Sequence, residues 1–179
     1  MFKFSSKIKE SFIKLILFLF IIPGLISFIG CFSYSFTGAS VPEHLKSIAI
    51  PIAEDRSGSG EPGLRENLTN SLIQKFIDDN TLQVTEKNKS DAILNCSIIS
   101  VTNAPAIITG GETVEQRRIT ITVQAVYRDL VKRKIIFENN FSYYGDYPSG
   151  GSLDDKNQAI EAAIDKISDD ILLAVVSGW

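Results

Sequence analysis

The fold is decided by the stretch Gln116–Arg128, which reads QRRITITVQAVYR. Apolar and polar residues alternate along it, as they do in an antiparallel strand that covers a core on one side only. The apolar face consists of Ile119, Ile121, Val123, Ala125 and Tyr127. The polar face consists of Thr120, Thr122, Gln124 and Arg128. The stretch therefore predicts a strand with one buried and one polar face.

Further strands are predicted on both sides of this stretch. Residues 135–144 follow a turn at 129–133 and return as the hairpin partner, while the apolar residues 92–101 precede it as a central strand. Residues 45–53 predict a first strand with Ile48, Ile50 and Ile52 on one face, and residues 82–85 predict a short one. Pro51 lacks an N–H and places the first strand near an edge or at its end. Loops are expected at 54–63, at 103–111 because of Pro105 and a Gly-Gly pair, and at 145–151.

Two helices complete the predicted fold. Residues 64–79 repeat apolar residues at helical spacing and stop at Asn80; the stripe is Leu64, Leu68, Leu72, Ile73, Phe76 and Ile77. Ser152 and Asp155 form a capping box at the start of the last helix, and Gly178 follows its end. Its stripe is Ile160, Ala163, Ile164, Ile167, Ile171, Ala174 and Val175. We expect an α+β fold in which both helices pack on one face of a mostly antiparallel sheet with four main strands.

The amino-terminal residues have the pattern of a secretory signal. Four lysines and one glutamate precede an apolar run from Leu15 to Cys31, which ends in Phe28-Ile29-Gly30-Cys31. The cysteine after Gly30 resembles the lipobox of bacterial lipoproteins, whose signal is cleaved before an acylated cysteine, although Phe28 replaces the usual leucine. We expect a cleaved lipoprotein signal peptide at 1–30, a lipidated tether at 31–44 and a single domain at 45–179.

Three alternatives to a lipoprotein signal compete for these residues. A transmembrane anchor needs about 20 apolar residues, and this run is shorter and contains Pro23-Gly24. An ordinary signal peptide would leave Cys31 as a free thiol. A buried amino-terminal helix would not explain the lysines.

The charge of the chain limits its partners. The net charge is −3, and because the leader contributes four lysines and one glutamate, the remainder carries −6. A net acidic domain is a poor candidate for nucleic-acid or general anionic-membrane binding. An anionic ligand would need a local basic patch, for which the candidates are Arg117, Arg118 and the hairpin-tip residues Lys132, Arg133 and Lys134. Arg118 shares the polar face of the strand, whereas Arg117 shares the face of Ile119 and is expected to snorkel at the core edge.

No catalytic, metal or cofactor pattern is recognisable in the sequence. The single histidine, His44, stands beside Pro42 without further metal-ligand partners. Cys96 lies in an apolar strand and is expected to be a buried, inert thiol. The pairs Asp154-Asp155 and Asp169-Asp170 fit a helix start and a solvated helix face, and Gly58-Ser59-Gly60 lacks the lysine of a phosphate-binding loop. We expect a non-enzymatic protein with neither metal nor cofactor.

Several segments resemble the LptE-type lipopolysaccharide-assembly lipoproteins. They are Cys31 followed by Tyr34–Ser40 (YSFTGAS), Ile48–Pro51, Glu115–Val123 and the final helix to Trp179. The first strand departs from the family pattern, because Ile52-Ala53 stand where aromatics are common and Asp55 precedes Arg56. A strand ending in proline also occurs in TolB- and LpoB-like periplasmic domains.

The resemblance implies a lipoprotein on the periplasmic side of the outer membrane. It would help to assemble and plug the LptD-type barrel and would assist lipopolysaccharide delivery to the outer leaflet. Candidate barrel contacts are Tyr34, Phe36, Thr120, Thr122 and Gln124, and candidate lipopolysaccharide contacts are Arg118, Arg117, Lys132, Arg133 and Lys134. The alternative is a lipid-anchored regulator of a cell-wall synthase or another envelope complex.

Overall fold

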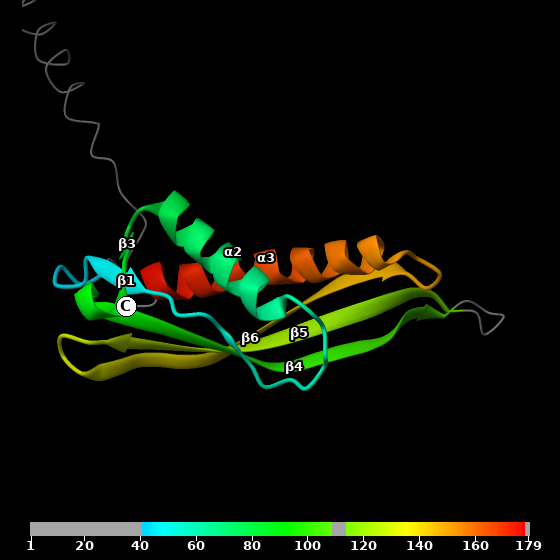
Figure 1. Cartoon of the computed structure of the whole chain (residues 1–179), viewed down its shortest axis with the longest axis horizontal. Helices are drawn as coiled ribbons and strands as arrows, with labels where there is room; N and C mark the ends of the chain where they lie inside the picture. The colour runs from blue at the N-terminus through cyan, green and yellow to red at the C-terminus, as the bar shows by residue number, and fades with distance from the viewer. Residues whose placement is uncertain (1–40, 109–113, 178–179) are drawn as a thin grey trace, which may run out of the picture. The chain divides into compact units, whose positions relative to one another are not determined.

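The computed structural model describes residues 41–108 and 114–177. The described elements are β1 (Ser47–Ala49), β2 (Glu54–Asp55), α2 (Leu64–Asp79), β3 (Gln83–Val84), the 3-10 helix η1 (Lys87–Lys89), β4 (Ala92–Ile108), β5 (Val114–Asp129), β6 (Lys134–Pro148) and α3 (Leu153–Ser177). The predictions made for the leader, Cys31, Tyr34, Phe36, the Gly110-Gly111 pair, Gly178 and Trp179 lie outside the described residues. Figure 1 shows both helices on one side of the sheet, which confirms the predicted α+β class.

The stretch that decides the fold lies in the middle of a three-stranded antiparallel meander. β5 pairs with β4 from Ala92↔Asp129 to Ile108↔Val114, and with β6 from Asp129↔Lys134 to Gln116↔Pro148. Its five predicted core residues, Ile119, Ile121, Val123, Ala125 and Tyr127, are all buried. The predicted alternation is therefore confirmed along this strand.

The sheet has six strands of mixed direction, so the prediction of four strands was wrong. The strand order is β3-β1-β4-β5-β6, with β2 also paired to β4. β1 runs parallel to both β3 and β4, and β2 runs parallel to β4. These three parallel strands are only two or three residues long. Strands this short offer almost no alternation for a sequence pattern to detect.

The first predicted strand is shorter than its hydrophobic pattern suggested. Strand pairing ends at Ala49, and Ile52 is 54% exposed rather than aligned with the buried Ile48. Pro51 has no N–H to continue a ladder, so the chain leaves the sheet before it returns as β2. The predicted loop at 54–63 therefore begins with a paired segment.

Two strands run past positions where loops were predicted. β4 continues through Pro105, which pairs with Arg117 next to a register shift. Beyond Ile98 no described strand pairs with the other side of β4, so an edge proline leaves no ladder bond unmade. β6 continues through Gly145 to Pro148. Gly145 allows α3 to approach the strand, because a Cβ there would lie 2.1 Å from the carbonyl oxygen of Ala159.

The helices begin and end close to the predicted residues. α2 spans Leu64–Asp79 and stops at Asn80, whose φ of 56° is left-handed, but Ile77 is 54% exposed instead of buried. At the start of α3 the Ser152 hydroxyl and N–H both bond Asp155 Oδ2, at 2.9 and 2.7 Å, and the Asp155 N–H returns a bond of 3.2 Å. These bonds confirm the capping box.

The core lies between the two helices and the sheet. It includes Leu68, Leu72 and Phe76 of α2, Ile160, Ile164, Ile167 and Ile171 of α3, and the buried face of β4 and β5. Lys75 Nζ joins the helices at 2.8 Å from Asp165 and 2.7 Å from Asp169. Asp169 is therefore an ion-pair partner as well as part of the solvated face that the sequence suggested.

Candidate functional site

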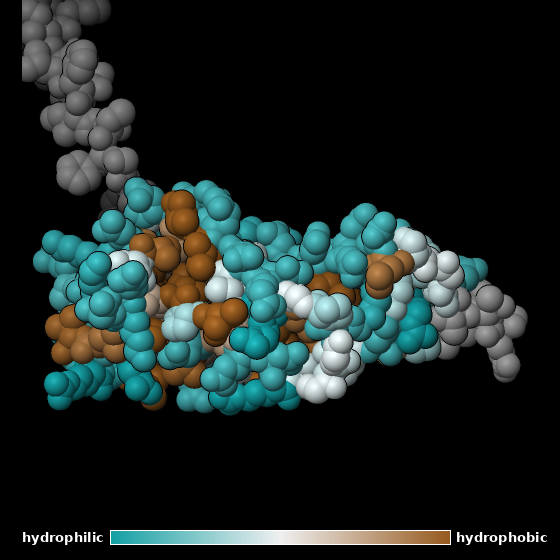
Figure 2. All heavy atoms as spheres, viewed as in Figure 1, coloured by the Kyte–Doolittle hydropathy of each residue, from teal (hydrophilic) through white to brown (hydrophobic). Residues whose placement is uncertain are grey.

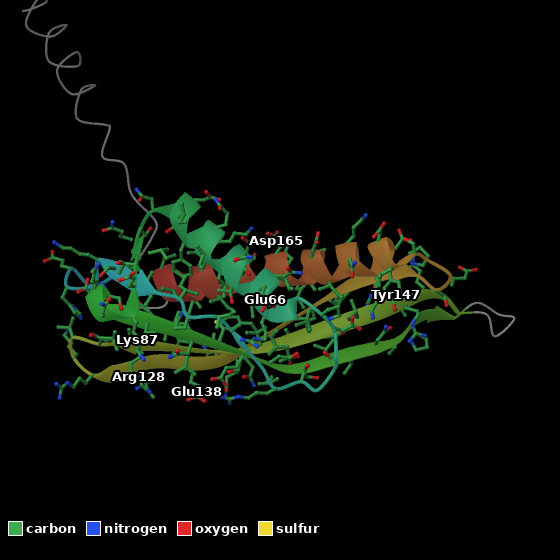
Figure 3. The ribbon with its side chains drawn as sticks, viewed as in Figure 1. Glu66, Lys87, Arg128, Glu138, Tyr147 and Asp165 are labelled. Carbon is green, nitrogen blue, oxygen red and sulfur yellow. The ribbon has the colours of Figure 1, made fainter. Side chains whose placement is uncertain are left out.

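The face of the sheet that the helices leave uncovered is polar over the middle of β4, β5 and β6. Register places Ser100, Thr122 and Ser142 in one row across the three strands, and Ser97, Gln124 and Asn140 in the next. Figure 3 shows Arg128 and Glu138 on this side, while Glu66 and Asp165 lie among the helices. The polar face therefore includes the predicted barrel contacts Thr120, Thr122 and Gln124.

Hydrogen bonds between strands fix several side chains of this polar face. Thr122 Oγ1 lies 3.0 Å from Ser142 Oγ, and Gln124 Nε2 donates to Glu138 Oε1 at 3.0 Å. The second bond is diagonal, because Gln124 is directly opposite Asn140. A partner that docks here would meet an ordered polar surface and would need to immobilise few side chains.

Arg118, predicted as a lipopolysaccharide contact, is held by its neighbours on β6. Its Nε and Nη2 atoms each lie 2.7 Å from an oxygen of Asp146, and its guanidinium carbon is 3.6 Å from the centre of the Tyr144 ring. The hydrogen bonds from Arg118 lower the pKa of Asp146. The guanidinium is therefore oriented on the polar face but largely neutralised by its carboxylate.

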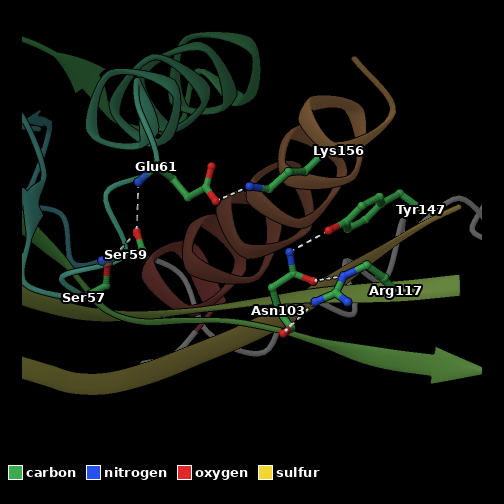
Figure 4. A network of polar contacts seen from close by, with 7 residues as sticks. All are labelled: Ser57, Ser59, Glu61, Asn103, Arg117, Tyr147 and Lys156. Atoms are coloured by element: carbon green, nitrogen blue, oxygen red, sulfur yellow. Dashed lines mark hydrogen bonds and ion pairs between the residues drawn. The ribbon is translucent and has the colours of Figure 1, made fainter. Parts of the chain in front are cut away.

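Arg117 faces the other side of the sheet, as the alternation predicted. It donates from Nε to Asn103 Oδ1 at 3.0 Å, and Asn103 Nδ2 donates to Tyr147 Oη at 2.6 Å (Figure 4). Figure 4 also shows Lys156 of α3 paired with Glu61 of the loop before α2. Arg117 thus belongs to a structural network instead of simply snorkelling at the core edge.

The hairpin-tip residues are fully separate from the two arginines. Lys132, Arg133 and Lys134 are exposed, and Asp129 orders the turn by accepting a 2.7 Å bond from the Lys132 N–H. Eleven positions of β5 separate Arg118 from Asp129, a distance of about 36 Å at the usual rise of a strand. The five predicted lipopolysaccharide contacts therefore do not form one patch.

One contact at the hairpin was not foreseen from the sequence. His44 Nε2 lies 2.7 Å from Asp129 Oδ2, and Asp129 is only 4% exposed. Burial opposes ionisation of Asp129, yet the bonds from His44 and the Lys132 N–H leave its pKa below the ordinary value. Asp at the start of a turn is a recognisable signal, but its pairing with a residue 85 positions earlier is not.

A hollow in the sheet surface and a buried cysteine are the remaining features of this site. A hollow of about 350 Å³ lies where Pro51, Ile52, Glu54 and Arg56 approach the polar face, near Gln124 and Arg128. Within residues 41–108 and 114–177, no three His, Cys, Asp or Glu side chains are grouped to hold a metal ion. Cys96 is buried, and burial raises its pKa to about 12, so its thiol is inert as predicted.

A protein-family model decides the relationship. The lipopolysaccharide-assembly family LptE matches residues 45–175, which include every described strand and helix apart from the last two residues of α3. The chain belongs to the LptE family. The resemblance found in the sequence is thereby confirmed, and with it a family-level role in lipopolysaccharide assembly.

Solved structures share the fold of this LptE-family domain at low sequence identity. A hypothetical protein of Chlamydia trachomatis is 9% identical with a TM-score of 0.56, over 73% of this chain and 95% of that one. A Xanthomonas campestris protein is 13% identical with a TM-score of 0.54, over 78% and 91%. Rare lipoprotein B of Shewanella oneidensis is 12% identical with a TM-score of 0.50, over 72% and 92%.

No curated protein sequence matches this chain. Neither described helix, α2 nor α3, has the length and apolar character needed to span a bilayer.

Proposed function

We propose that this protein is an outer-membrane lipoprotein that assists the assembly of a lipopolysaccharide-transport barrel of the LptD type and plugs it. In this role it aids delivery of lipopolysaccharide to the outer leaflet. The observation that carries the proposal is the LptE family match over residues 45–175, which includes every described strand and all of the described helices except the last two residues of α3.

The polar face of β4, β5 and β6 suits the inside of such a barrel. The lumen of an outer-membrane barrel is lined with polar side chains. Thr122 and Gln124 already have hydrogen-bond partners on β6, so contact with a polar wall leaves few buried groups unpaired. The helices cover the opposite face, which leaves this face open to a partner (Figure 1).

The tether supplies the attachment to the membrane. We infer that Cys31 is the acylated first residue after cleavage of residues 1–30, and that 31–44 connects it to the domain on the periplasmic side of the outer membrane. Tyr34 and Phe36 in this segment are proposed barrel contacts. One acyl chain holds a protein only marginally, whereas several hold it firmly.

The protein acts in this proposal by binding, without turnover of its own. The inert thiol of Cys96 and the structural pairing of His44 with Asp129 leave both side chains committed to the fold. The function therefore depends on surfaces and on the partner that covers them.

Affinity purification of the full chain from membranes in mild detergent tests the proposal. A large barrel should co-purify with the wild type. Thr122→Lys places a cation in the polar face and should reduce recovery of the barrel, whereas Asn70→Lys, on the exposed side of α2, should not.

Depletion of the protein provides the second test. Barrel abundance and surface lipopolysaccharide should both fall. If both stay unchanged while cell-wall synthesis changes, the protein is instead a regulator of a cell-wall synthase or another envelope complex.

A further inference from the structure

The cationic side chains of the domain are concentrated at one end. Three segments, 43–46, 86–91 and 128–134, meet there and define what we call the basic end. They contain seven lysines and arginines against four acidic residues, although residues 31–179 as a whole carry a net charge of −6. The cations are Lys46, Lys87, Lys89, Arg128, Lys132, Arg133 and Lys134.

Hydrogen bonds hold the three segments together. The Leu130 N–H donates to the carbonyl oxygen of Asp91 at 2.8 Å, and the Lys46 N–H donates to Asp91 Oδ2 at 3.0 Å. His44 binds Asp129 at the base of the hairpin turn. In Figure 1 the tip of the β5–β6 hairpin lies at the same end as β1 and β3, and Figure 3 shows Lys87 and Arg128 there.

The acidic side chains of the basic end are mostly engaged within the fold. Asp91 accepts bonds from the N–H groups of Lys46 and Ser47, and Asp129 is nearly buried against His44. Glu86 forms a 3.5 Å ion pair with Lys89. By contrast, Lys46, Lys87, Lys132, Arg133 and Lys134 are exposed. The surface at this end is therefore more positive than the residue count suggests.

Apolar side chains are exposed among these cations. Val131 is 58% exposed at the hairpin tip and Ile135 is 44% exposed just after it. A cavity of about 300 Å³ lies beside the hairpin and is lined by Pro42, His44, Asp129, Lys132, Lys134 and Ile136. In Figure 2 apolar surface, in brown, adjoins hydrophilic surface, in teal, at this end. Exposed cations around a few apolar side chains are the composition that suits an anionic lipid surface.

We propose that the basic end docks on the anionic phospholipid headgroups of a membrane, with Val131 and Ile135 entering the interface. Val41, the first described residue, leads into this end through Pro42 and His44. The ten residues from Cys31 to Val41 reach at most about 35 Å. The proposed Cys31 anchor, on which this inference rests, therefore keeps the basic end within reach of the surface.

The net negative charge of the domain does not prevent this docking. Charges more than about 8 Å from the surface are largely screened at physiological ionic strength. The remaining described residues carry the excess of acids, and many of these lie on α3, for example Glu161 and Asp170. Only the basic end needs to approach the headgroups, so local attraction decides the orientation.

Fluorescent probes on the full chain test the proposal. The protein is purified from membranes and reconstituted in vesicles of phosphatidylcholine alone or with one third phosphatidylglycerol. A dye is attached at Val131→Cys or, as the matched control, at Leu153→Cys, which is 70% exposed at the start of α3. Unsubstituted protein labelled in parallel corrects for Cys31 and Cys96. A water-soluble quencher should reach the Val131 probe less in anionic than in neutral vesicles, and should reach the Leu153 probe equally in both.

Charge variants then test whether the cations of the basic end cause the docking. Lys132→Gln should shift the docking equilibrium by roughly fivefold, since one cation near an anionic surface contributes about that factor. Lys166→Gln, an exposed lysine on α3, should have no effect. The triple change Lys132→Gln, Arg133→Gly, Lys134→Gln should abolish shielding, and Gly is compatible with the φ of 55° at position 133.

Two results would overturn the proposal. One is equal quenching of the Val131 probe in neutral and anionic vesicles, and the other is shielding that appears only when lipopolysaccharide replaces phosphatidylglycerol. The vesicles contain no barrel, so a negative result in the docking experiment does not affect the proposal that the protein binds a barrel. In the same way, loss of barrel co-purification does not affect the proposal that the basic end docks on a membrane. The two proposals can therefore fail separately.

Discussion

Gly145 is the residue on which the contact between β6 and α3 depends. A Cβ at this position would lie 2.1 Å from the carbonyl oxygen of Ala159 and 2.7 Å from its Cα, and both atoms belong to a helix backbone that cannot rotate away. Only a residue without a side chain allows this approach.

We predict that Gly145→Ala lowers the free energy of unfolding by about 2 kcal/mol or more, as overpacking does in a dense interior. Gly150→Ala is the control, because a Cβ there meets no atom within 4 Å. It should change stability by less than about 0.5 kcal/mol. Urea unfolding of both variants measures the difference, and equal stability would show that α3 can shift at no cost.

Arg118 remains the candidate lipopolysaccharide contact on the polar face. Its bidentate pair with Asp146 means that a phosphate must compete with a carboxylate for the same guanidinium. We predict that Arg118→Ala weakens lipopolysaccharide binding, that Asp146→Asn strengthens it, and that salt weakens it in the wild type. Binding of labelled lipopolysaccharide measures all three effects. Unchanged affinity in both variants would make the pair purely structural.

Two buried hydroxyls should respond oppositely to removal. Thr69 Oγ1 accepts the Ala53 N–H at 2.9 Å and donates to the Arg65 carbonyl at 2.6 Å. The Ser168 hydroxyl is buried and has no hydrogen-bond partner among the described residues. Thr69→Val should cost about 1 to 3 kcal/mol because it leaves a buried N–H unpaired.

Ser168→Ala should raise stability by up to about 1 kcal/mol, since it removes an unpaired buried hydroxyl and favours the helix. Thermal unfolding of the two variants provides the measurement. A loss of stability in Ser168→Ala would reveal a partner for its hydroxyl.

At the scale of elements, Asp91 fastens β1 to the start of β4. Its carboxylate accepts the Lys46 and Ser47 N–H groups, each at 3.0 Å, and the Ser47 hydroxyl at 2.8 Å. These bonds, with the Lys46 N–H contributing most, lower the pKa of Asp91. A lowered carboxyl pKa stabilises the fold above the unfolded pKa of about 3.9, and this stabilisation is lost as pH falls through the folded pKa.

We therefore predict that wild-type stability falls more steeply than that of Asp91→Asn as pH drops below about 4. At neutral pH the variant should be less stable by about 1 kcal/mol, because a charge-assisted hydrogen bond becomes a neutral one. Urea unfolding as a function of pH gives both quantities. Parallel pH profiles would show that Asp91 contributes no acid dependence.

At the scale of the whole molecule, the proposed lipid anchor and the domain make separate contributions. We predict that Cys31→Ser leaves an unprocessed precursor, since the thiol is the proposed site of acylation. Cys96→Ala is the matched control, because Cys96 is buried in β4 and should play no part in processing. Intact-mass analysis of membrane fractions distinguishes them. An unmodified Cys31, or a retained leader, in the wild type would refute the lipoprotein proposal.

The sequence by itself determined the elements that are long and periodic. Ile119, Ile121, Val123, Ala125 and Tyr127 alternate over a full strand, and the structure buries them all. The bounds of α2 and the capping box of α3 also followed from local chemistry, since helix periodicity and capping involve residues three or four positions apart. Short sequence segments also resembled the LptE family closely enough for the relationship to be recognised before the family match confirmed it.

Only the tertiary structure decided which distant residues meet. The short parallel strands β1, β2 and β3 exist because β4 and its neighbours offer them pairing partners, not because their own residues demand it. At Gly145 the strand continues, and the missing side chain leaves space for the backbone of α3. Arg118 and Lys132 belong to separate surfaces because the length of β5 lies between them. Register, edges and helix placement depend on contacts between residues far apart in the chain. A local sequence pattern contains no information about such contacts until packing selects them.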